Sequence, residues 1–333
     1  MSETIPEMLE GAINLPPFRE RWPWRGPHLQ TVRNTLSRPR FRLAAGERLR
    51  FPMADGSGDV LLGLLNRPGR PVAGRPLAVL IHGLTGCETG SYMQATAVAL
   101  LAAGWPVLRL NLRGAGPSRD LCRLRYHAGR TRDIREVLAQ LPPALTADGV
   151  VMAGYSLGGN ALLKLLGEGD LPVPVRAAAS ISAPIDLRRS SLAFLEPRNR
   201  LYHRWLLARM KEESLAPGPG LEPRWIDAIR RSRSVWDFDD LFVAPWNGWS
   251  GAEEYYRVNS AAGFLETIRV PTLVIHALDD PWIPGDCYRA VAWERNPSLH
   301  PLLPAGGGHV GFHAPGGVWH DRCLTAFFGR HAG

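Results

Sequence analysis

Short apolar runs alternate along the chain with longer segments in which apolar residues recur at helical spacing. This alternation predicts strands separated by helices, which is typical of an α/β fold with a mostly parallel sheet covered by helices on both faces. The predicted strands span 77–82, 105–110, 150–153, 177–182, 272–277 and 299–303. The predicted helices span 92–103, 131–140, 158–166, 286–293 and 318–328.

Two segments depart from that alternation. Residues 41–53 and 60–66 flank a turn-rich ADGSG segment and predict an antiparallel hairpin. Between 184 and 263 the alternation stops, which predicts an inserted helical lid. The lid would divide the α/β core into a first part, 1–183, and a second part, 264–333. The first part would begin with an N-terminal arm and the hairpin, to about residue 70. We expect most aromatic residues of its second half to pack the lid onto the core, with one or two lining a pocket. These residues are Trp236, Phe238, Phe242, Trp246, Trp249, Tyr255 and Tyr256.

A serine lies where a predicted buried strand meets a predicted helix. Residues 154–158 read GYSLG, and glycines around such a serine allow a sharp, strained turn that lifts the hydroxyl out of the sheet. The pentapeptide alone is a weak signal, but its position between a strand and a helix makes it specific. Ser156 is therefore the predicted nucleophile.

A serine nucleophile requires a histidine base and a carboxylate, which follow in the order Ser, Asp or Glu, His in this kind of site. Asp279 and Asp280 follow the predicted strand 272–277, and His309 follows a glycine-rich loop. Asp280 is favoured as the acid because Pro284 follows it after a few residues. Asp279 stays an alternative and would otherwise hydrogen-bond the loop.

The tetrahedral intermediate of acyl transfer requires backbone amides that stabilise its oxyanion. The amide of Leu157 directly follows the nucleophile, and the amide of Leu84 lies in the glycine-bearing loop after the strand 77–82. These two amides form the predicted oxyanion hole. His82 is expected to order this loop.

Composition and charge exclude several other classes of function. The net charge is +8, but only Lys164 and Lys211 are lysines, the arginines are scattered, and no nucleic-acid motif accompanies them. Nucleic-acid binding is therefore not predicted, whereas a weak contact with anionic membrane surfaces is compatible with the charge. The glycines of residues 114–116 lack the third glycine of a dinucleotide site, and no cofactor is expected.

Four cysteines, Cys87, Cys122, Cys287 and Cys323, lie far apart without a C-x-x-C pair. This spacing predicts reduced thiols and no metal site. The N-terminus lacks the pattern of a secretory signal, and no apolar run reaches the ~18 residues of a transmembrane helix. We therefore expect a cytoplasmic protein without a transmembrane segment.

Short blocks in one order along nearly the whole chain make it resemble the YheT-type branch of the α/β-hydrolases, a group of carboxylesterases and acylglycerol lipases. The blocks are PHLQT (27–31), HGLTG (82–86), LNLRG (110–114), YHAG (126–129), 154–164, FDD (238–240), VAP (243–245), YY (255–256), DDP (279–281) and GGHVGF (307–312). The resemblance implies an α/β-hydrolase fold and ester hydrolysis without a cofactor. It assigns the triad to Ser156, Asp280 and His309.

The predicted function is hydrolysis of carboxylic esters through an acyl-enzyme on Ser156, as in a carboxylesterase or an acylglycerol lipase. The aromatic lid predicts a preference for apolar acyl chains, so the expected partner is a small-molecule ester, lipids included. Two alternatives stay open: hydrolysis of an amide or a thioester by the same triad, and a non-catalytic binding module on this fold.

Overall fold

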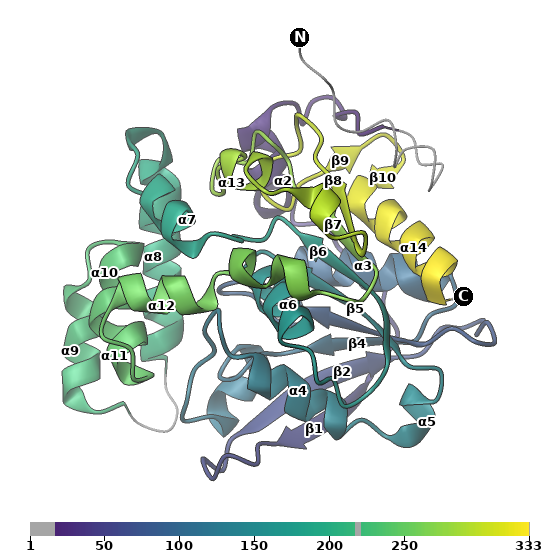
Figure 1. Ribbon diagram of the computed structural model, residues 1–333, viewed down its shortest axis with the longest axis horizontal. Helices are drawn as coiled ribbons and strands as arrows, with labels where there is room; N and C mark the ends of the chain where they lie inside the picture. Colours follow the sequence, from purple (N-terminus) through teal and green to yellow (C-terminus); the bar gives the residue numbers. More distant parts are fainter. Residues whose placement is uncertain (1–16, 217–220, 333) are drawn as a thin grey trace.

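The computed structural model describes residues 17–216 and 221–332, and its centre is an eight-stranded sheet (Figure 1). The strands are β1 (Glu47–Pro52), β2 (Val60–Asn66), β3 (Leu77–Ile81), β4 (Val107–Leu110), β5 (Val150–Tyr155), β6 (Val175–Ile181), β7 (Thr272–Ile275) and β8 (Leu299–Leu302). Their order is β1-β2-β4-β3-β5-β6-β7-β8. Strand β2 is antiparallel to both neighbours, and the other neighbouring pairs are parallel. The predicted α/β class is confirmed.

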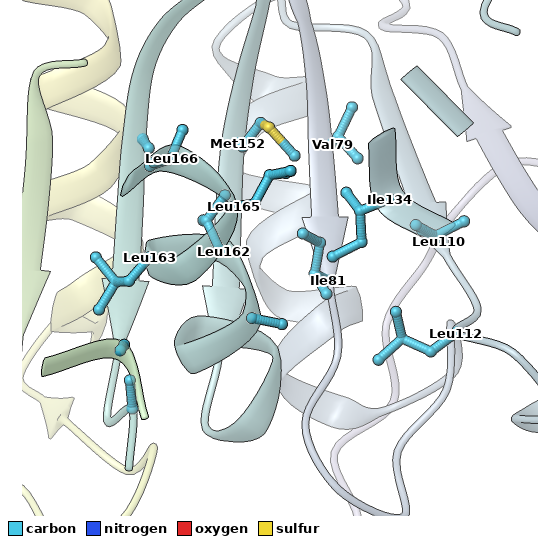
Figure 2. Close-up of a cluster of buried hydrophobic side chains, with 14 of the residues drawn as sticks. Val79, Ile81, Leu110, Leu112, Ile134, Met152, Leu162, Leu163, Leu165 and Leu166 are labelled. Atoms are coloured by element: carbon cyan, nitrogen blue, oxygen red, sulfur yellow. The ribbon is translucent and has the colours of Figure 1, made fainter. Parts of the chain in front are cut away.

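Helices cover both faces of this sheet. Residues Val79 and Ile81 of β3 face a core that contains α4 (Thr131–Ala139) and α6 (Leu157–Glu168), and Figure 2 shows this cluster. Residues Ala78 and Leu80 face a second core, which contains α3 (Ser91–Ala102) and α14 (Trp319–Ala332). Both faces of β3 are buried, which explains why its sequence is a continuous apolar run.

The remaining elements lie at the N-terminus and in the connections. They are α2 (Pro27–Ser37), α5 (Pro143–Thr146), α13 (Asp286–Arg289), the pair β9 (His313–Ala314) and β10 (Gly317–Val318), and the 3₁₀ turns Gly116–Leu121, Ala261–Thr267 and Trp293–Arg295. The predicted helix 286–293 is wrong in its second half. If the helix continued, the carbonyl of Tyr288 would accept a hydrogen bond from the amide of residue 292. Instead, this carbonyl accepts a hydrogen bond from the indole N–H of Trp293.

A group of helices is inserted between β6 and β7. It comprises α7 (Leu187–Ala193), the 3₁₀ turn Pro197–Asn199, α8 (Arg200–Leu215), α9 (Pro223–Arg231), α10 (Val235–Phe238), a π-helical turn (Asp239–Val243), α11 (Ala244–Trp246) and α12 (Ala252–Asn259). Residues 187–216 and 221–259 are called the insertion below, and Figure 1 shows it beside the sheet. It has its own apolar core around Phe238 and Phe242. The division of the chain into core and lid at 184 and 263 stays a prediction.

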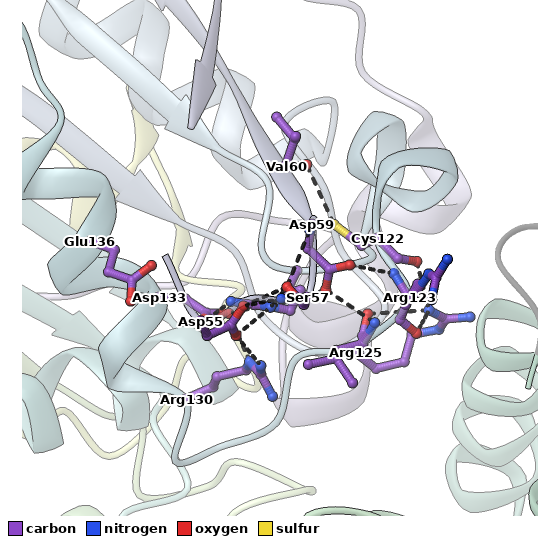
Figure 3. Close-up of polar contacts among 12 residues, drawn as sticks. Asp55, Ser57, Asp59, Val60, Cys122, Arg123, Arg125, Arg130, Asp133 and Glu136 are labelled. Carbon is purple, nitrogen blue, oxygen red and sulfur yellow. Dashed lines mark hydrogen bonds and ion pairs between the residues drawn. The ribbon is translucent and has the colours of Figure 1, made fainter. Parts of the chain in front are cut away.

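A buried ionic network joins the β1–β2 hairpin to the segment after β4. The guanidinium of Arg113, which is 1% exposed, contacts the carboxylates of Asp55, Asp59 and Asp133. Asp59 also accepts hydrogen bonds from the amides of residues 123 and 124, as Figure 3 shows for the first of these. The Arg113 carbonyl accepts a hydrogen bond from the amide of Tyr126. The network therefore fixes the segment that carries Tyr126, which contacts the site described next.

Candidate active site

Ser156 lies in a tight turn between the end of β5 and the start of α6. Its φ is 50°, in the left-handed region that is costly for a residue with a side chain. Glycines allow this turn because a Cβ on Gly158 would lie 2.3 Å from the carbonyl oxygen of His82, and one on Gly83 would lie 2.9 Å from the Cβ of Ser156. The turn therefore depends on close backbone contacts that only glycine permits.

Three side chains predicted from the sequence lie in one hydrogen-bonded series. The Nε2 atom of His309 is 3.0 Å from the Oγ atom of Ser156, and its Nδ1 atom is 2.8 Å from Oδ2 of Asp280. The other oxygen of Asp280 accepts hydrogen bonds from the amides of Trp282 (2.8 Å) and Ile283 (3.1 Å). An ionised carboxylate only accepts, so the imidazole carries its proton on Nδ1 and presents a basic Nε2 to the serine.

The two adjacent aspartates contact different groups. Asp279 accepts a hydrogen bond from the amide of Gly308 at 3.0 Å, and burial raises the pKa of its carboxyl. Asp280, not Asp279, faces the imidazole of His309. The indole of Trp282 stacks on this imidazole, with ring centroids 4.4 Å apart and planes at 22°. Trp282 was not predicted; its place directly after the DDP block is the only signal that the sequence offered.

The loop after β3 is fixed on both sides of Leu84. The amide of Gly83 donates to the hydroxyl of Tyr92 at 3.0 Å, and the amide of Thr85 donates to the hydroxyl of Tyr126 at 2.6 Å. Within the described part of the chain the intervening amide of Leu84 has no acceptor. Leu157 is the first residue of α6, so its amide has no acceptor within the helix. The two amides predicted for the oxyanion hole are thus free to bind a ligand.

His82 has the ordering role that its position suggested. Its Nε2 atom accepts a hydrogen bond from the amide of Leu112 at 3.0 Å, and Nδ1 donates to the carbonyl of Gly83 at 2.7 Å. Burial lowers the pKa of His82 to about 4, so the ring is neutral at pH 7. His82 therefore links the loop after β3 to the segment after β4.

A cavity of about 830 Å³ opens above Ser156 and His309. The aromatic residues of the insertion that line it are Phe238, Phe242, Trp246, Tyr255 and Tyr256 in its second half, and Phe194, Tyr202 and Trp205 in its first half. The expectation that only one or two of the aromatic residues in the second half would do so is wrong, because the short helices α10–α12 turn five aromatic side chains toward the cavity. The rings of Phe242 and Trp246, for example, lie 4.9 Å apart. The cavity is also lined by four charged residues, Arg125, Arg198, Glu213 and Asp239, and burial raises the pKa of each of the two carboxyls to about 7.

Comparison with known proteins decides the family. A family model described as alpha/beta hydrolase fold matches residues 76–314. The chain belongs to the α/β-hydrolase family. The Escherichia coli (strain K12) protein named "Putative esterase YheT" is 32% identical over 86% of this chain and 84% of its own length, which confirms the YheT-type resemblance.

Other relatives and solved structures agree with this family. The monoacylglycerol lipase of Saccharomyces cerevisiae is 30% identical over 76% of this chain and 59% of its own length. The mouse phospholipase ABHD3 is 27% identical over 75% of this chain and 61% of its own length. The crystal structure of the Pyrococcus furiosus esterase Pf2001 superposes with a TM-score of 0.61 at 16% identity, covering 96% of this chain and 98% of that one. This last similarity shows the fold.

Two further properties bear on partners. No helix in the described ranges is long and apolar enough to cross a membrane. Among the same residues, His, Cys, Asp and Glu side chains form no group that could hold a metal ion.

Proposed function

We propose that this chain hydrolyses carboxylic esters through an acyl-enzyme on Ser156, with His309 as the base and Asp280 as the acid of the triad. The hydrogen-bonded series from Ser156 through His309 to Asp280, at the base of an apolar cavity, carries this proposal. The esterase and lipase names of the relatives support the same reaction class.

Acylation follows from the orientation of the imidazole. Nε2 of His309 takes the proton of the Ser156 hydroxyl as Oγ attacks the ester carbonyl carbon. The imidazolium then protonates the leaving alkoxide, the C–O bond of the ester breaks, and the alcohol departs. Asp280 holds the Nδ1 proton and stabilises the charged ring. In deacylation His309 takes a proton from water as the water oxygen attacks the acyl carbon. The bond between the acyl carbon and Oγ of Ser156 then breaks, Oγ takes the proton back from His309, and the carboxylic acid departs.

The negative charge on the carbonyl oxygen needs donors that are already in place. The amides of Leu84 and Leu157 are assigned this role. Because the amides of Gly83 and Thr85 are occupied by the hydroxyls of Tyr92 and Tyr126, the loop needs no reorganisation during the reaction. Loss of one such donor typically costs about 10²- to 10³-fold in rate.

The cavity selects for apolar acyl chains. Its aromatic lining favours burial of a hydrocarbon chain. We therefore propose that the substrates are esters of the kind that carboxylesterases and acylglycerol lipases hydrolyse.

The unpaired state of Cys87, Cys122, Cys287 and Cys323 supports a cytoplasmic location.

A panel of p-nitrophenyl esters of graded acyl length tests this function. We expect the native protein to hydrolyse them with a preference for apolar over carboxylated acyl groups, and Ser156→Ala to be inactive with an unchanged thermal midpoint. Unchanged hydrolysis by Ser156→Ala would refute the proposal. Matched thioesters and anilides in the panel identify the alternative substrate classes, and a native protein inactive on all of them would indicate a non-catalytic module.

A further inference from the structure

The PHLQT block near the N-terminus forms the first half of α2, far in the sequence from the residues of the triad. In the fold, α2 packs directly against the glycine-rich loop that carries His309. A Cβ on Gly308 would lie 2.5 Å from the carbonyl oxygen of Pro27, and one on Gly311 would lie 2.6 Å from that of Gln30. The helix backbone and the loop backbone are thus in contact at two points.

Side chains of α2 also hold the loop by hydrogen bonds. The hydroxyl of Thr31 accepts a hydrogen bond from the backbone amide of His309 at 2.9 Å and donates to the carbonyl of Pro27 at 2.7 Å. The amide group of Gln30, which is fully buried, accepts from the amide of His313 at 2.7 Å and donates to its carbonyl at 3.1 Å. Gln30 also donates to the carbonyl of Trp24 at 2.6 Å.

The loop needs such anchors because its conformation is unfavourable by itself. Val310 and Phe312 have φ values of 54° and 48°, and a β-branched or bulky residue in this region costs roughly 1–3 kcal/mol. A loop with two such residues persists only when surrounding groups determine its course. Within it, the amide of Val310 donates to Ser182, and α2 provides the partners of His309 and His313.

We propose that α2 positions the catalytic base, and that Thr31 and Gln30 are positioning residues for proton transfer by His309. This inference rests on the proposed function, because it assumes that His309 takes the proton of Ser156. Trp282 and Asp280 fix the ring of His309, whereas Thr31 fixes its backbone. Without the Thr31 hydroxyl the buried amide of His309 loses its acceptor, so the loop shifts and the distance from Nε2 to the serine changes.

The test compares Thr31→Val, Thr31→Ser and Thr325→Val with the native protein. Valine keeps the shape of threonine, and serine restores the hydroxyl. Thr325 in α14 is the matched control, because its hydroxyl also donates to the carbonyl four residues earlier, that of Asp321, at 2.7 Å. Both threonines are partly buried, but among the described residues the Thr325 hydroxyl hydrogen-bonds only to its own helix. Hydrolysis of one p-nitrophenyl ester gives kcat and KM, and thermal unfolding gives the folded fraction.

For Thr31→Val we expect kcat to fall about 10- to 100-fold with KM within about twofold of the native value, because misplacement by about 1 Å can cost such a factor. Thr31→Ser should recover most of kcat, and Thr325→Val should retain all of it. Should Thr31→Val fail to fold, Thr31→Ala, which leaves room for a water, provides the same comparison of kcat per folded molecule.

Native kcat in folded Thr31→Val would overturn the inference while leaving the proposed function in place. So would equal losses in Thr31→Val and Thr325→Val, since they would show a general effect of removing a helix hydroxyl. A native protein that neither hydrolyses the ester nor differs from Ser156→Ala would overturn both.

Discussion

The turn that holds Ser156 and the loop that holds His309 are stabilised in different ways. The serine turn is fixed by backbone contacts between the start of α6 and the end of the neighbouring strand β3, where Gly158 meets the carbonyl of His82. The histidine loop is fixed by side chains of α2, and Thr31 and His309 are 278 positions apart in the sequence. The first arrangement belongs to the sheet and cannot move without it, whereas the second depends on a helix that packs on the outside.

Gly158→Ala gives the largest expected effect, and it tests whether the turn that holds Ser156 is rigid. The new Cβ would meet the carbonyl oxygens of His82 and Ile81 at 2.3 and 2.7 Å, and the sheet cannot shift to relieve this contact. We expect a loss of more than about 3 kcal/mol in the free energy of unfolding, measured by denaturant titration. Gly263→Ala is the control, since its Cβ would have no heavy atom within 4 Å. Near-native stability of Gly158→Ala would contradict the rigid description.

Gly311→Ala tests whether the loop that holds His309 can adapt to a new side chain. Its Cβ would meet the carbonyl oxygens of Gly307 at 2.5 Å and Gln30 at 2.6 Å, and the loop and α2 can separate to accommodate it. We expect kcat to fall about 100-fold, because His309 moves, with a loss of only about 1–3 kcal/mol in unfolding free energy. If activity fell only as far as the folded fraction did, the two regions would not differ as described.

Tyr126→Phe tests whether the loop after β3 is fixed by backbone contacts, as the serine turn is, or by distant side chains, as the histidine loop is. Phenylalanine removes the acceptor of the Thr85 amide, and we expect kcat to fall about tenfold with little change in KM as the amide of Leu84 loses its fixed position. Tyr288→Phe is the matched control, because it loses a buried hydrogen bond to the carbonyl of Ala183. Equal kcat values for both variants would show that Tyr126 contributes only to stability.

Glu213→Gln gives the smallest expected effect and links the insertion to this loop. Tyr126 donates to Glu213 at 3.0 Å, and burial raises the pKa of this carboxyl to about 7. The folded state therefore holds the proton more tightly than the unfolded state, so the stability contributed by the neutral carboxyl is lost as pH rises from about 4.5 through 7.

Glutamine stays neutral, so we expect its stability relative to the native protein to rise between pH 5 and pH 8 by an amount on the order of 2 kcal/mol. Asp239, whose pKa is also raised to about 7, is present in both proteins and cancels in this difference. Denaturant titrations across this pH range provide the measurement. A difference that does not change with pH would mean that Glu213 is not buried as described.

The features that could be predicted from the sequence are those that depend on short-range patterns of residues. Apolar runs located the strands of the sheet, and the glycines around Ser156 and before His309 located the two groups that lie 3.0 Å apart. Contacts between distant segments left no such pattern. Nothing around Thr31, Tyr126 or Trp282 indicates which backbone amide or ring it meets, and the aromatic lining that the insertion contributes to the cavity depends on how its short helices pack.

Covalent labelling of Ser156 tests the central claim most directly. A fluorophosphonate reacts with a serine only when a base activates its hydroxyl, so intact mass and peptide mapping of the treated protein report the triad itself. We predict one adduct, on Ser156, in the native protein and in Thr325→Val, and none at the same time point in Ser156→Ala or His309→Ala. An unlabelled native protein, or equal labelling of Ser156 in His309→Ala, would contradict the account.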